Sequence, residues 1–564
     1  MDFRKDFFDD LLIGIVTILT YTQTKYNYMN LSQKLLYLGS KKQNTIFSAS
    51  IVLAVTFGLS ALLGFLRSRF LYAQFYSCCA VELDAYNAAF RIPDLIFKLL
   101  VSGALSASFI PVFSSYLHKD EAKAYSIAST VINLLLIAFV SISFFVLIFA
   151  HPLSAMVAPG FSLEQISLMA NLTRILLVAQ IFFLISNFLT GMLQVHQVFI
   201  IPSLSPIVYN ISIIASILLL APSFGIYGVV IGAVVGAMFH LVIQIPLAKS
   251  LGFRYSLQID PSLDGVKEIV RLMIPRTISI GLGEIENTVS LFFASTLAAG
   301  SLSLLNLAVQ LMSLPSRIFG TTIGQASLPI LSKNIARNEL DLFRNTVRKV
   351  LAQSLFIAIP ITTLILIHRV ALIRIAFGAK EFPWSATLLT AKTLAYLTPA
   401  IISQAIIQIL VRSFYALHNT KTPLQVSFFS LLVNVVSSFF FITYTDLGIV
   451  GLAISISLGN VVQCIGLFYM FITIVDGQGW RQAYFNYSKI ALASLGMGIV
   501  SWASLQVLDL FVLDTSKTMS LIFLTSISVL IGVSSFLALS RFLKIDEYYD
   551  YIKYFRRLKG FIFR

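Results

Sequence analysis

The stretch that decides the fold is residues 125–150, which read YSIASTVINLLLIAFVSISFFVLIFA and contain no Lys, Arg, Asp or Glu. A helix of about 20 apolar residues is long enough to cross the ~30 Å hydrocarbon core of a bilayer. Inside that core every backbone N–H and C=O group needs an internal partner, which an α-helix supplies within one segment. The stretch therefore predicts a transmembrane helix.

The composition extends this prediction to most of the 564-residue chain. Hydrophobic residues make up 57% and charged residues 12%, about half of the ~25% that soluble domains carry. The mean hydropathy is +0.87. With so few polar groups to cover a surface, a cytosolic enzyme, a nucleic-acid-binding domain and a disordered chain are excluded. A transmembrane barrel is disfavoured, because its signature is alternating segments of ~10 residues.

The fold class predicted from these apolar stretches is an all-α polytopic membrane protein with about fourteen transmembrane helices. The predicted spans lie near 46–66, 86–116, 125–150, 164–194, 199–220, 224–246, 268–296, 301–331, 350–371, 386–411, 422–443, 447–474, 489–508 and 520–540. Several of them exceed the length of one bilayer crossing and contain proline or polar residues. We therefore expect tilted or kinked helices among them.

The positive charge predicts the orientation. The net charge is +15, from 40 Lys and Arg against 25 Asp and Glu. Most of the cations fall in loops on the same side as the N-terminus, as is typical of cytoplasmic loops. The predicted outer loops contain only Arg67, Arg69, Arg369, Arg374, Lys380 and Lys517. Both termini are therefore expected in the cytoplasm, which agrees with an even number of spans.

The chain repeats itself about 220 residues apart. Three motif pairs recur in the same order, namely PDLIF at 93–97 with PSRIF at 315–319, SFIPVFS at 108–114 with SLPILS at 327–332, and GIYG at 225–228 with GIVG at 448–451. Each copy holds six spans, an even number, so both copies insert with the same orientation. We predict two parallel six-helix lobes around a central cavity, an architecture suited to alternating access.

The predicted organisation has five parts. They are an extension at 1–45 that is cytoplasmic or lies on the membrane surface, an N-terminal lobe at 46–246, a C-terminal lobe at 247–474, two extra spans at 475–543, and a basic cytoplasmic tail at 544–564. Tyr and Phe alternate with the cations of the tail. This pattern favours a surface helix on anionic lipid, with RNA binding as the remote alternative.

The sequence contains no nucleophile elbow, P-loop or His/Asp/Glu metal spacing, so we predict a protein that is not an enzyme and binds no metal or cofactor. Cys78 and Cys79 are neighbours, a spacing at which disulfides rarely form, and Cys464 stands alone. A channel would more often be a ring of several subunits around a shared pore. These features favour a transporter, which we expect to be a monomer. Na⁺ and H⁺ are the candidate coupling ions.

Three motifs in the first two spans are more specific. They read GFLR at 64–67, DAYNAAFRIP at 84–93 and SGALSASFIPV at 102–112. They closely resemble the pattern GF-x-R, DAF-x-x-AF-[KR]-[IL]-P and EGA-[FL]-S-x-x-F-[IV]-P of the MurJ/MviN family of lipid II flippases. That family lies in the multidrug/oligosaccharidyl-lipid/polysaccharide exporter superfamily. The resemblance covers roughly residues 45–545, including all predicted spans.

The resemblance implies a function. The family moves lipid II, the undecaprenyl-pyrophosphate-linked peptidoglycan precursor, from the inner to the outer leaflet of the bacterial cytoplasmic membrane. It implies a cationic cavity between the lobes for the pyrophosphate and sugar head group, and a groove for the lipid tail along the two extra C-terminal helices. Membrane potential or a cation gradient is expected to drive the cycle.

Several family positions differ in this chain. Ala61, Phe97 and Gln310 stand where the family commonly has cations, and Ser102 replaces a Glu. Two transport hypotheses therefore stay open: a divergent lipid II flippase, or a cation-coupled exporter of another polyprenyl-linked glycan or of drugs. A third hypothesis, a membrane scaffold, does not explain why charges would be placed within spans at a cost of ~2.5–3.5 kcal/mol each.

Cations in or beside the spans are the candidate substrate-binding residues. They are Arg67, Arg91, Lys98, Arg174 and Arg317, with Gln310 at a family cation position. A guanidinium presents a planar fork that matches phosphate oxygens. Arg317 lies two turns from Gln310 on the same face, so we expect it to supply the missing charge. The structural alternatives are a snorkelling cation for Arg67 and a carboxylate partner for Arg91.

Acidic residues supply the candidate gate and coupling sites. Asp84 begins the second span, where it either forms a gate ion pair with Arg67 or Arg69 or acts as a helix N-cap. Glu284 and Glu286 lie deep in the seventh span, about 200° apart around a helix axis. One of them is a candidate site for ion coupling. The alternative is a structural ion pair with Arg276, which lies on roughly the same face as Glu284.

Overall fold

The structure is a computed structural model that describes residues 46–316, 320, 322–378, 382–475, 480–511 and 518–553. The described segments are helices joined mostly by short turns, and they contain no strand. A connection without helix runs over residues 251–263. The all-α fold expected from the composition is therefore confirmed.

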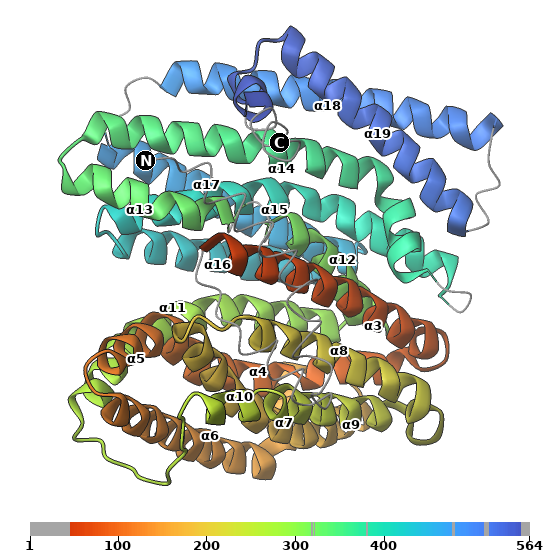
Figure 1. Cartoon of the computed structure of the whole chain (residues 1–564). Helices are drawn as coiled ribbons and strands as arrows, with labels where there is room; N and C mark the ends of the chain where they lie inside the picture. Colours follow the sequence, from red (N-terminus) through yellow and green to blue (C-terminus); the bar gives the residue numbers. More distant parts are fainter. Residues whose placement is uncertain are drawn as a thin grey trace, which may run out of the picture. The chain divides into compact units, whose positions relative to one another are not determined.

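The first of two compact units contains residues 46–71 and 85–285 of the described chain. Its elements are the first part of α3 (Ile46–Ala89), α4 (Arg91–Phe97), α5 (Ile110–Leu117), α6 (Glu121–Val157), α7 (Leu163–Val195), α8 (Ile200–Leu219), α9 (Ala221–Val242), α10 (Ile245–Ser250) and most of α11 (Asp264–Ser295). α7 packs against α6 and α9, and α8 packs against α9 (Figure 1).

The second unit contains Tyr72–Asp84 and the described residues after Ile285. Its elements are α12 (Ser301–Pro315), α13 (Thr322–Ala336), α14 (Leu340–Phe377), α15 (Trp384–Ala416), α16 (Lys421–Tyr444), α17 (Ile449–Val475), α18 (Trp480–Phe511) and α19 (Thr518–Phe542). α15 packs against α12, α14 and α17. α18 and α19, drawn in blue in Figure 1, pair with each other and lie against α14.

Each unit has its own aromatic core. In the first, the Phe109 ring stacks on Phe113 with centroids 5.4 Å apart and meets Phe188 edge-on at 4.9 Å. In the second, Phe471 lies 6.1 Å from Phe343 and 5.9 Å from Phe414. Such ring pairs add attraction beyond the area that they bury. Buried aromatic residues thus hold the helices of each unit together.

Ten helical stretches in the described residues are long and apolar enough to cross a membrane. They are α6, α7, α8, α9 with α10, and α14 to α19, and they coincide with ten of the predicted spans. The other predicted spans, 46–66, 86–116, 268–296 and 301–331, are helical where described. One of them is broken by π-helical turns and another is divided between α12 and α13. The total of fourteen stays a prediction.

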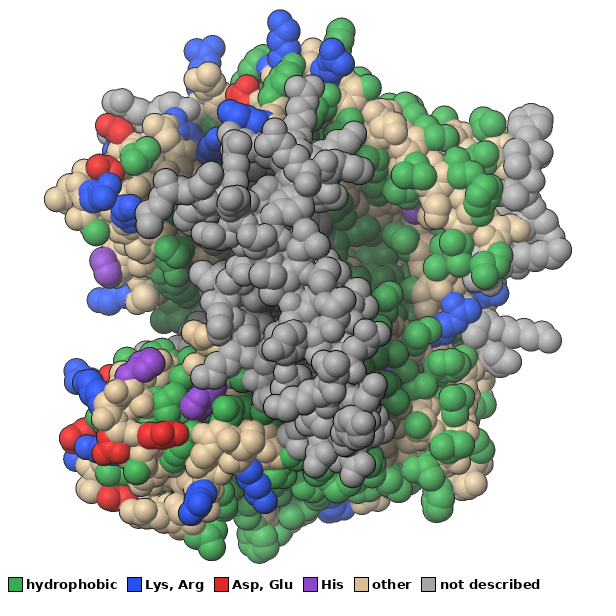
Figure 2. Space-filling view, in the orientation of Figure 1, with side chains coloured by type: hydrophobic (Ala, Val, Ile, Leu, Met, Phe, Trp, Pro, Cys, Tyr) green, Lys and Arg blue, Asp and Glu red, His purple; other side chains and the backbone are tan. Residues whose placement is uncertain are grey.

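The outer surfaces of the helices are apolar, as a lipid environment requires. On α16, the side chains of Phe429, Val436 and Phe439 are 59%, 65% and 53% exposed. Figure 2 shows hydrophobic side chains over much of the helix surfaces. Exposed apolar area on this scale marks a surface that is not in contact with water. The chain is a multi-pass membrane protein.

Unusual backbone conformations recur at the repeat distance found in the sequence. Gly225 and Gly448 both take a positive φ, 56° and 54°, at the beginning of α9 and just before α17. Gln197 and His418, at the ends of α7 and α15, also take positive φ, 62° and 57°. Left-handed backbone is rare for residues other than glycine. Two such pairs at the repeat distance support an internal duplication.

The compact units do not follow the predicted lobe boundaries. Residues 247–285 pack with the first unit, and Tyr72–Asp84 packs with the second. The connection at 251–263 explains part of this difference, because Asn133 on α6 donates to the carbonyls of Ser256 and Gln258 at 2.9 Å each. The lobes at 46–246 and 247–474 therefore remain a prediction about transport movements.

α3 bends at Cys79, whose φ of −144° and ψ of 44° are not helical. The structure joins Cys78 and Cys79 by a disulfide, which corrects the expectation that these neighbours would not pair. The break in the helix is the reason, since it removes the regular ~100° rotation that separates successive side chains. Among the described cysteines, Cys464 is free.

Candidate functional site

The second predicted span is an interrupted helix. α4 is followed by a π-helical turn at Lys98–Ser102, and a second π-helical turn at Leu105–Phe109 precedes α5. π-helical turns are rare, alter the hydrogen-bond pattern of the backbone and often lie at functional sites. The most distinctive sequence motif of the chain therefore lies on a distorted helix, and Lys98 begins the first distortion.

Glu284 on α11 bridges two cations of this span. Its Oε2 lies 2.6 Å from Nη2 of Arg91, and its Oε1 lies 3.0 Å from Nζ of Lys98. The side chains of Arg91 and Glu284 are 12% and 10% exposed, whereas that of Lys98 is 38% exposed. Arg91 also donates to the backbone carbonyl of Glu284. A single carboxylate thus pairs with two cations that the sequence assigned to phosphate binding.

One face of α11 fixes the position of Glu284. Thr277 donates from Oγ1 to the carbonyl of Leu99 at 3.0 Å, and Gly281 also faces Leu99. Thr277, Gly281 and Glu284 are spaced four and three residues apart, so they lie on the same side of the helix. At Gly103, an added Cβ would lie 2.3 Å from Oγ1 of Thr277. Only glycine at position 103 allows this close approach of the two segments.

Asp94 adds a second carboxylate to the same segment. It accepts a hydrogen bond of 2.8 Å from Nε2 of Gln180, a residue of α7 that is only 4% exposed. Arg91 and Lys98 lie near enough to interact with its charge. Asp94 and Glu284 are thus two carboxyl groups beside the two cations.

The donors of this site are of the kind that suit an anion. Arg91 and Lys98 offer charge-assisted donors, and Lys98 remains open to an approaching group. The carboxylate that bridges them shows that two oxygens of one anion fit between them. Among the residues that the structure describes, no three His, Cys, Asp or Glu side chains gather in a group that could hold a metal ion.

The structural ion pair that was the alternative reading of Glu284 is formed with Arg91 and Lys98, because α4 and the π-helical turn bring these cations against α11. The sequence named Arg276 as a partner in that alternative. The side chain of Arg276 lies outside the described residues. Glu286 is half-buried, and its backbone carbonyl accepts from Ser290 Oγ at 3.1 Å. Its role in ion coupling stays a prediction.

Of the two roles considered for Asp84, the structure shows the helix cap, and a gate ion pair with Arg67 or Arg69 stays a prediction. Asp84 is 2% exposed, and its carboxylate accepts from the N–H groups of Gly300 and Ser303 at 2.6 and 2.8 Å and from the Ser303 hydroxyl at 2.5 Å. These donors lie at the beginning of α12, where unpaired N–H groups and the helix dipole favour an anion. Asp84 therefore caps a helix, but the helix that it caps begins more than 200 residues further along the chain.

Two cations on α3 and one on α7 were also predicted to contact the substrate or form the gate. Arg67 and Arg69 are half-buried on α3. Arg174 on α7 donates from Nε to the carbonyl of Leu147 on α6 at 3.1 Å and from Nη1 to Asn171 at 2.7 Å. These contacts connect α7 with α6, so Arg174 has a structural task in this conformation. The structure does not bring Arg174 together with Arg91 and Lys98.

The structure does not test the prediction that Arg317 supplies the positive charge missing at Gln310 in the eighth span. Gln310 is half-buried on α12, and its carbonyl accepts from the Ser313 hydroxyl at 2.9 Å. Arg317 lies outside the described residues. The role of Arg317 as a substitute cation therefore stays a prediction.

Sequence reasoning missed three residues of the site. Asp94 was quoted only as part of a repeat motif, and Gln180 is a polar residue within an apolar span, a signal that could have identified it. Thr277 gave no signal, because threonine is common in membrane helices. All three make contacts between helices, which a single-helix pattern does not reveal.

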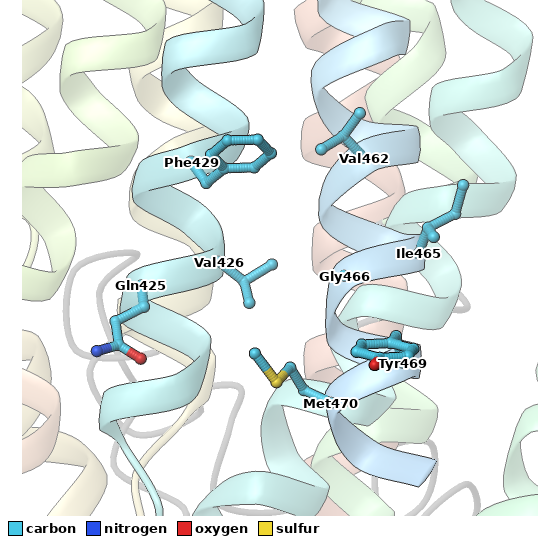
Figure 3. Close-up of a pocket in the computed structure, with 8 residues that line it drawn as sticks. All are labelled: Gln425, Val426, Phe429, Val462, Ile465, Gly466, Tyr469 and Met470. Atoms are coloured by element: carbon cyan, nitrogen blue, oxygen red, sulfur yellow. The ribbon is translucent and has the colours of Figure 1, made fainter. Parts of the chain in front are cut away.

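The second unit contains a pocket between α16 and α17 with a volume of about 420 Å³. Figure 3 shows Val426 and Phe429 on one helix facing Val462 and Met470 on the other. Gln425, Ile465, Gly466 and Tyr469 complete the lining. The lining is nearly all apolar, so the pocket suits hydrocarbon and does not suit a charged head group.

Comparison with known proteins supplies the family. The family model described as "Lipid II flippase MurJ" matches residues 79–522. A probable lipid II flippase MurJ of Bdellovibrio bacteriovorus is 27% identical over 475 residues, covering 82% of this chain and 88% of that protein. One from Borreliella burgdorferi is 28% identical over 437 residues, covering 76% and 83%. The described site therefore lies within the matched region.

Solved structures share the fold. One described as "Lipid II flippase MurJ, inward closed conformation" has a TM-score of 0.71 at 24% identity, covering 88% of this chain and 99% of that chain. An inward-facing multidrug resistance MATE family transporter of the MOP superfamily has a TM-score of 0.61 at 15% identity, covering 76% and 99%. With the family model matching most of its length, this chain belongs to the lipid II flippase MurJ family.

Proposed function

We propose that this chain moves lipid II from the cytoplasmic to the outer leaflet of the bacterial cytoplasmic membrane by alternating access. The observation that carries the proposal is the family match over residues 79–522. The internal repeat adds support, because two parallel lobes can rock against each other around a fixed site. The chain acts as a transporter, and none of its proposed steps makes or breaks a covalent bond.

The diphosphate of the substrate binds at Arg91 and Lys98 in this proposal. Both are cations within the second span, and Lys98 is partly open. A hydrogen bond to a charged group is worth ~1.5–3 kcal/mol, so two of them give a substantial part of the affinity for a head group. Arg67, Arg174, Arg317 and Gln310 are the further proposed contacts to the head group.

The driving force is the membrane potential or a gradient of Na⁺ or H⁺. Glu284 and Glu286 support this proposal as two carboxylates within the seventh predicted span, where charges are costly and often functional. Both termini face the cytoplasm, the chain acts as a monomer, and the lipid tail lies along α18 and α19.

A second candidate is a cation-coupled exporter of another polyprenyl-linked glycan or of drugs. The observation that favours it is the neutral character of Ala61, Phe97 and Gln310, where the family commonly carries cations. The pairing of Arg91 and Lys98 with Glu284 lowers the free positive charge further. A substrate with fewer phosphates would fit such a site.

Complementation distinguishes the two candidates. The full chain is expressed in a bacterium depleted of its own lipid II flippase, and growth is followed together with lipid II in the outer leaflet. Restored growth with outward lipid II supports the first candidate. Membrane-inserted protein that restores neither, while vesicles containing it accumulate another polyprenyl diphosphate glycan, favours the second.

A further inference from the structure

Glu284 pairs with both cations in the folded chain, so the anion site that they form is already filled by a side chain. Its two oxygens are divided between Arg91 and Lys98, at 2.6 and 3.0 Å. Two oxygens of a diphosphate would use the same two donors, since carboxylate and phosphate oxygens accept from cations in similar geometry. Glu284 and a bound diphosphate are therefore alternatives for the same positions.

The site is built so that the carboxylate can leave while the frame remains. Arg91 donates to the backbone carbonyl of Glu284 as well as to its side chain, so it stays attached to α11 without the carboxylate. The hydrogen bond from Thr277 to Leu99 holds the two segments together independently. Lys98, the more exposed cation at 38%, offers the side from which an anion can enter.

We infer that Glu284 is an internal counter-anion that holds Arg91 and Lys98 while no substrate is bound and is displaced by the diphosphate of the substrate. The inference rests on the proposed function, which places the diphosphate at these two cations. The exchange keeps both cations paired with an anion before and after substrate binding, which matters most for Arg91, because its side chain is only 12% exposed and an unpaired buried charge is strongly unfavourable. When the carboxylate returns, it competes with the diphosphate and so promotes release of the cargo.

Binding tests the competition directly. The full chain in lipid nanodiscs is titrated with farnesyl diphosphate, a soluble polyprenyl diphosphate, by isothermal titration calorimetry. Glu284→Gln should lower Kd roughly tenfold, because it removes a like charge that competes for the same donors. Glu268→Gln is the matched control, since Glu268 is an exposed carboxylate on the same helix. An unchanged or higher Kd for Glu284→Gln, with the fold intact by circular dichroism, overturns the inference.

Transport gives a second readout that a merely structural role would not produce. In proteoliposomes loaded with fluorescent lipid II, Glu284→Gln should lower KM and also lower kcat, because binding tightens and release slows. If Glu284→Gln folds poorly, the double variant Lys98→Gln/Glu284→Gln is compared with Lys98→Gln instead. Because Lys98 is absent from both, the loss of Glu284 should change Kd much less than it does in the parent chain. An equal tightening with and without Lys98 contradicts competition for this cation.

A failure of the proposed function would give different results from a failure of the counter-anion inference. If Lys98→Gln binds farnesyl diphosphate and moves lipid II like the parent chain, the diphosphate is not held at Lys98, and the proposed substrate site is wrong. If Lys98→Gln weakens binding but Glu284→Gln does not tighten it, the substrate site stands and only the counter-anion inference fails.

Discussion

Asp84 and Glu284 are both buried carboxylates on long helices, but they are stabilised in opposite ways. Asp84 accepts from two backbone N–H groups and one hydroxyl at the beginning of α12. Glu284 pairs with two long cationic side chains. Backbone donors cannot move away from a helix terminus, whereas Arg and Lys side chains can rotate to another anion. The comparison indicates a permanent structural anion at Asp84 and an exchangeable one at Glu284.

Lys98→Ala should have the largest effect of the variants that test this comparison, because Lys98 is the more exposed of the two cations paired with Glu284. Lys98→Ala leaves Glu284 with Arg91 alone and removes one proposed contact to the diphosphate. Because Lys98 is partly exposed, we take the lower end of the ~1.5–3 kcal/mol expected for a charged hydrogen bond, which is still at least roughly tenfold in affinity. Lipid II transport in proteoliposomes should fall at least that much, with unchanged membrane insertion. Lys98→Arg is the control that keeps the charge, and wild-type transport by Lys98→Ala contradicts an exchangeable site.

Asp84→Ala tests the permanent site. It leaves the N–H groups of Gly300 and Ser303 without their acceptor in a buried place, at a cost of about 2–3 kcal/mol in the free energy of unfolding. Thermal unfolding in detergent should show a lower Tm. Asp84→Asn keeps one acceptor and should lose less. If both variants keep the parent Tm but lose transport, Asp84 is an exchangeable anion after all, and the contrast with Glu284 disappears.

Gly103→Ala tests the frame that positions Glu284. Its Cβ would lie 2.3 Å from Oγ1 of Thr277, so the second span and α11 must separate. Overpacking of this kind costs ~1–3 kcal/mol, and displacement of Glu284 should also weaken transport. Shortening the partner in Gly103→Ala/Thr277→Ala should recover part of the Tm. No recovery in the double variant would show that another contact fixes the distance between the two segments.

A third buried carboxylate, outside the spans, should give the smallest effect. Glu547 is 5% exposed and accepts from Asn486 at 2.8 Å, and burial raises its pKa above the ordinary value. The folded chain then binds more protons than the unfolded chain between the two pKa values, so stability falls as pH rises through the folded pKa. Glu547→Gln should flatten this decline of Tm with pH. A decline of the same slope in the variant assigns it to other groups.

Much of the fold could be predicted from the chain alone. The apolar runs located ten helices that the structure shows to be long enough to cross a bilayer, because a membrane span is recorded locally in about 20 consecutive residues. The repeat motifs marked positions where Gly225 and Gly448 share an unusual backbone conformation. The motif at 84–93 indicated the family that the comparisons then established.

The pairing of charges could not be predicted in the same way. The sequence singled out Arg91, Lys98, Asp84 and Glu284 as charges needing an explanation, because each is costly in an apolar span. It did not connect Glu284 with Arg91 and Lys98, and it left Asp84 with two possible roles, since partners were sought within one helix or at adjacent helix ends. The interruptions at Lys98–Ser102 and Leu105–Phe109 also left no visible mark in the residue pattern.

The sequence by itself determined that this is a helical membrane protein and where ten of its long apolar helices lie. Only the tertiary structure decided that Glu284 meets Arg91, a residue 193 positions away, and that Asp84 caps α12. The physical reason is the geometry of the helix. Its period fixes the direction of a side chain around its own axis, but the neighbour on that side depends on how the helices pack.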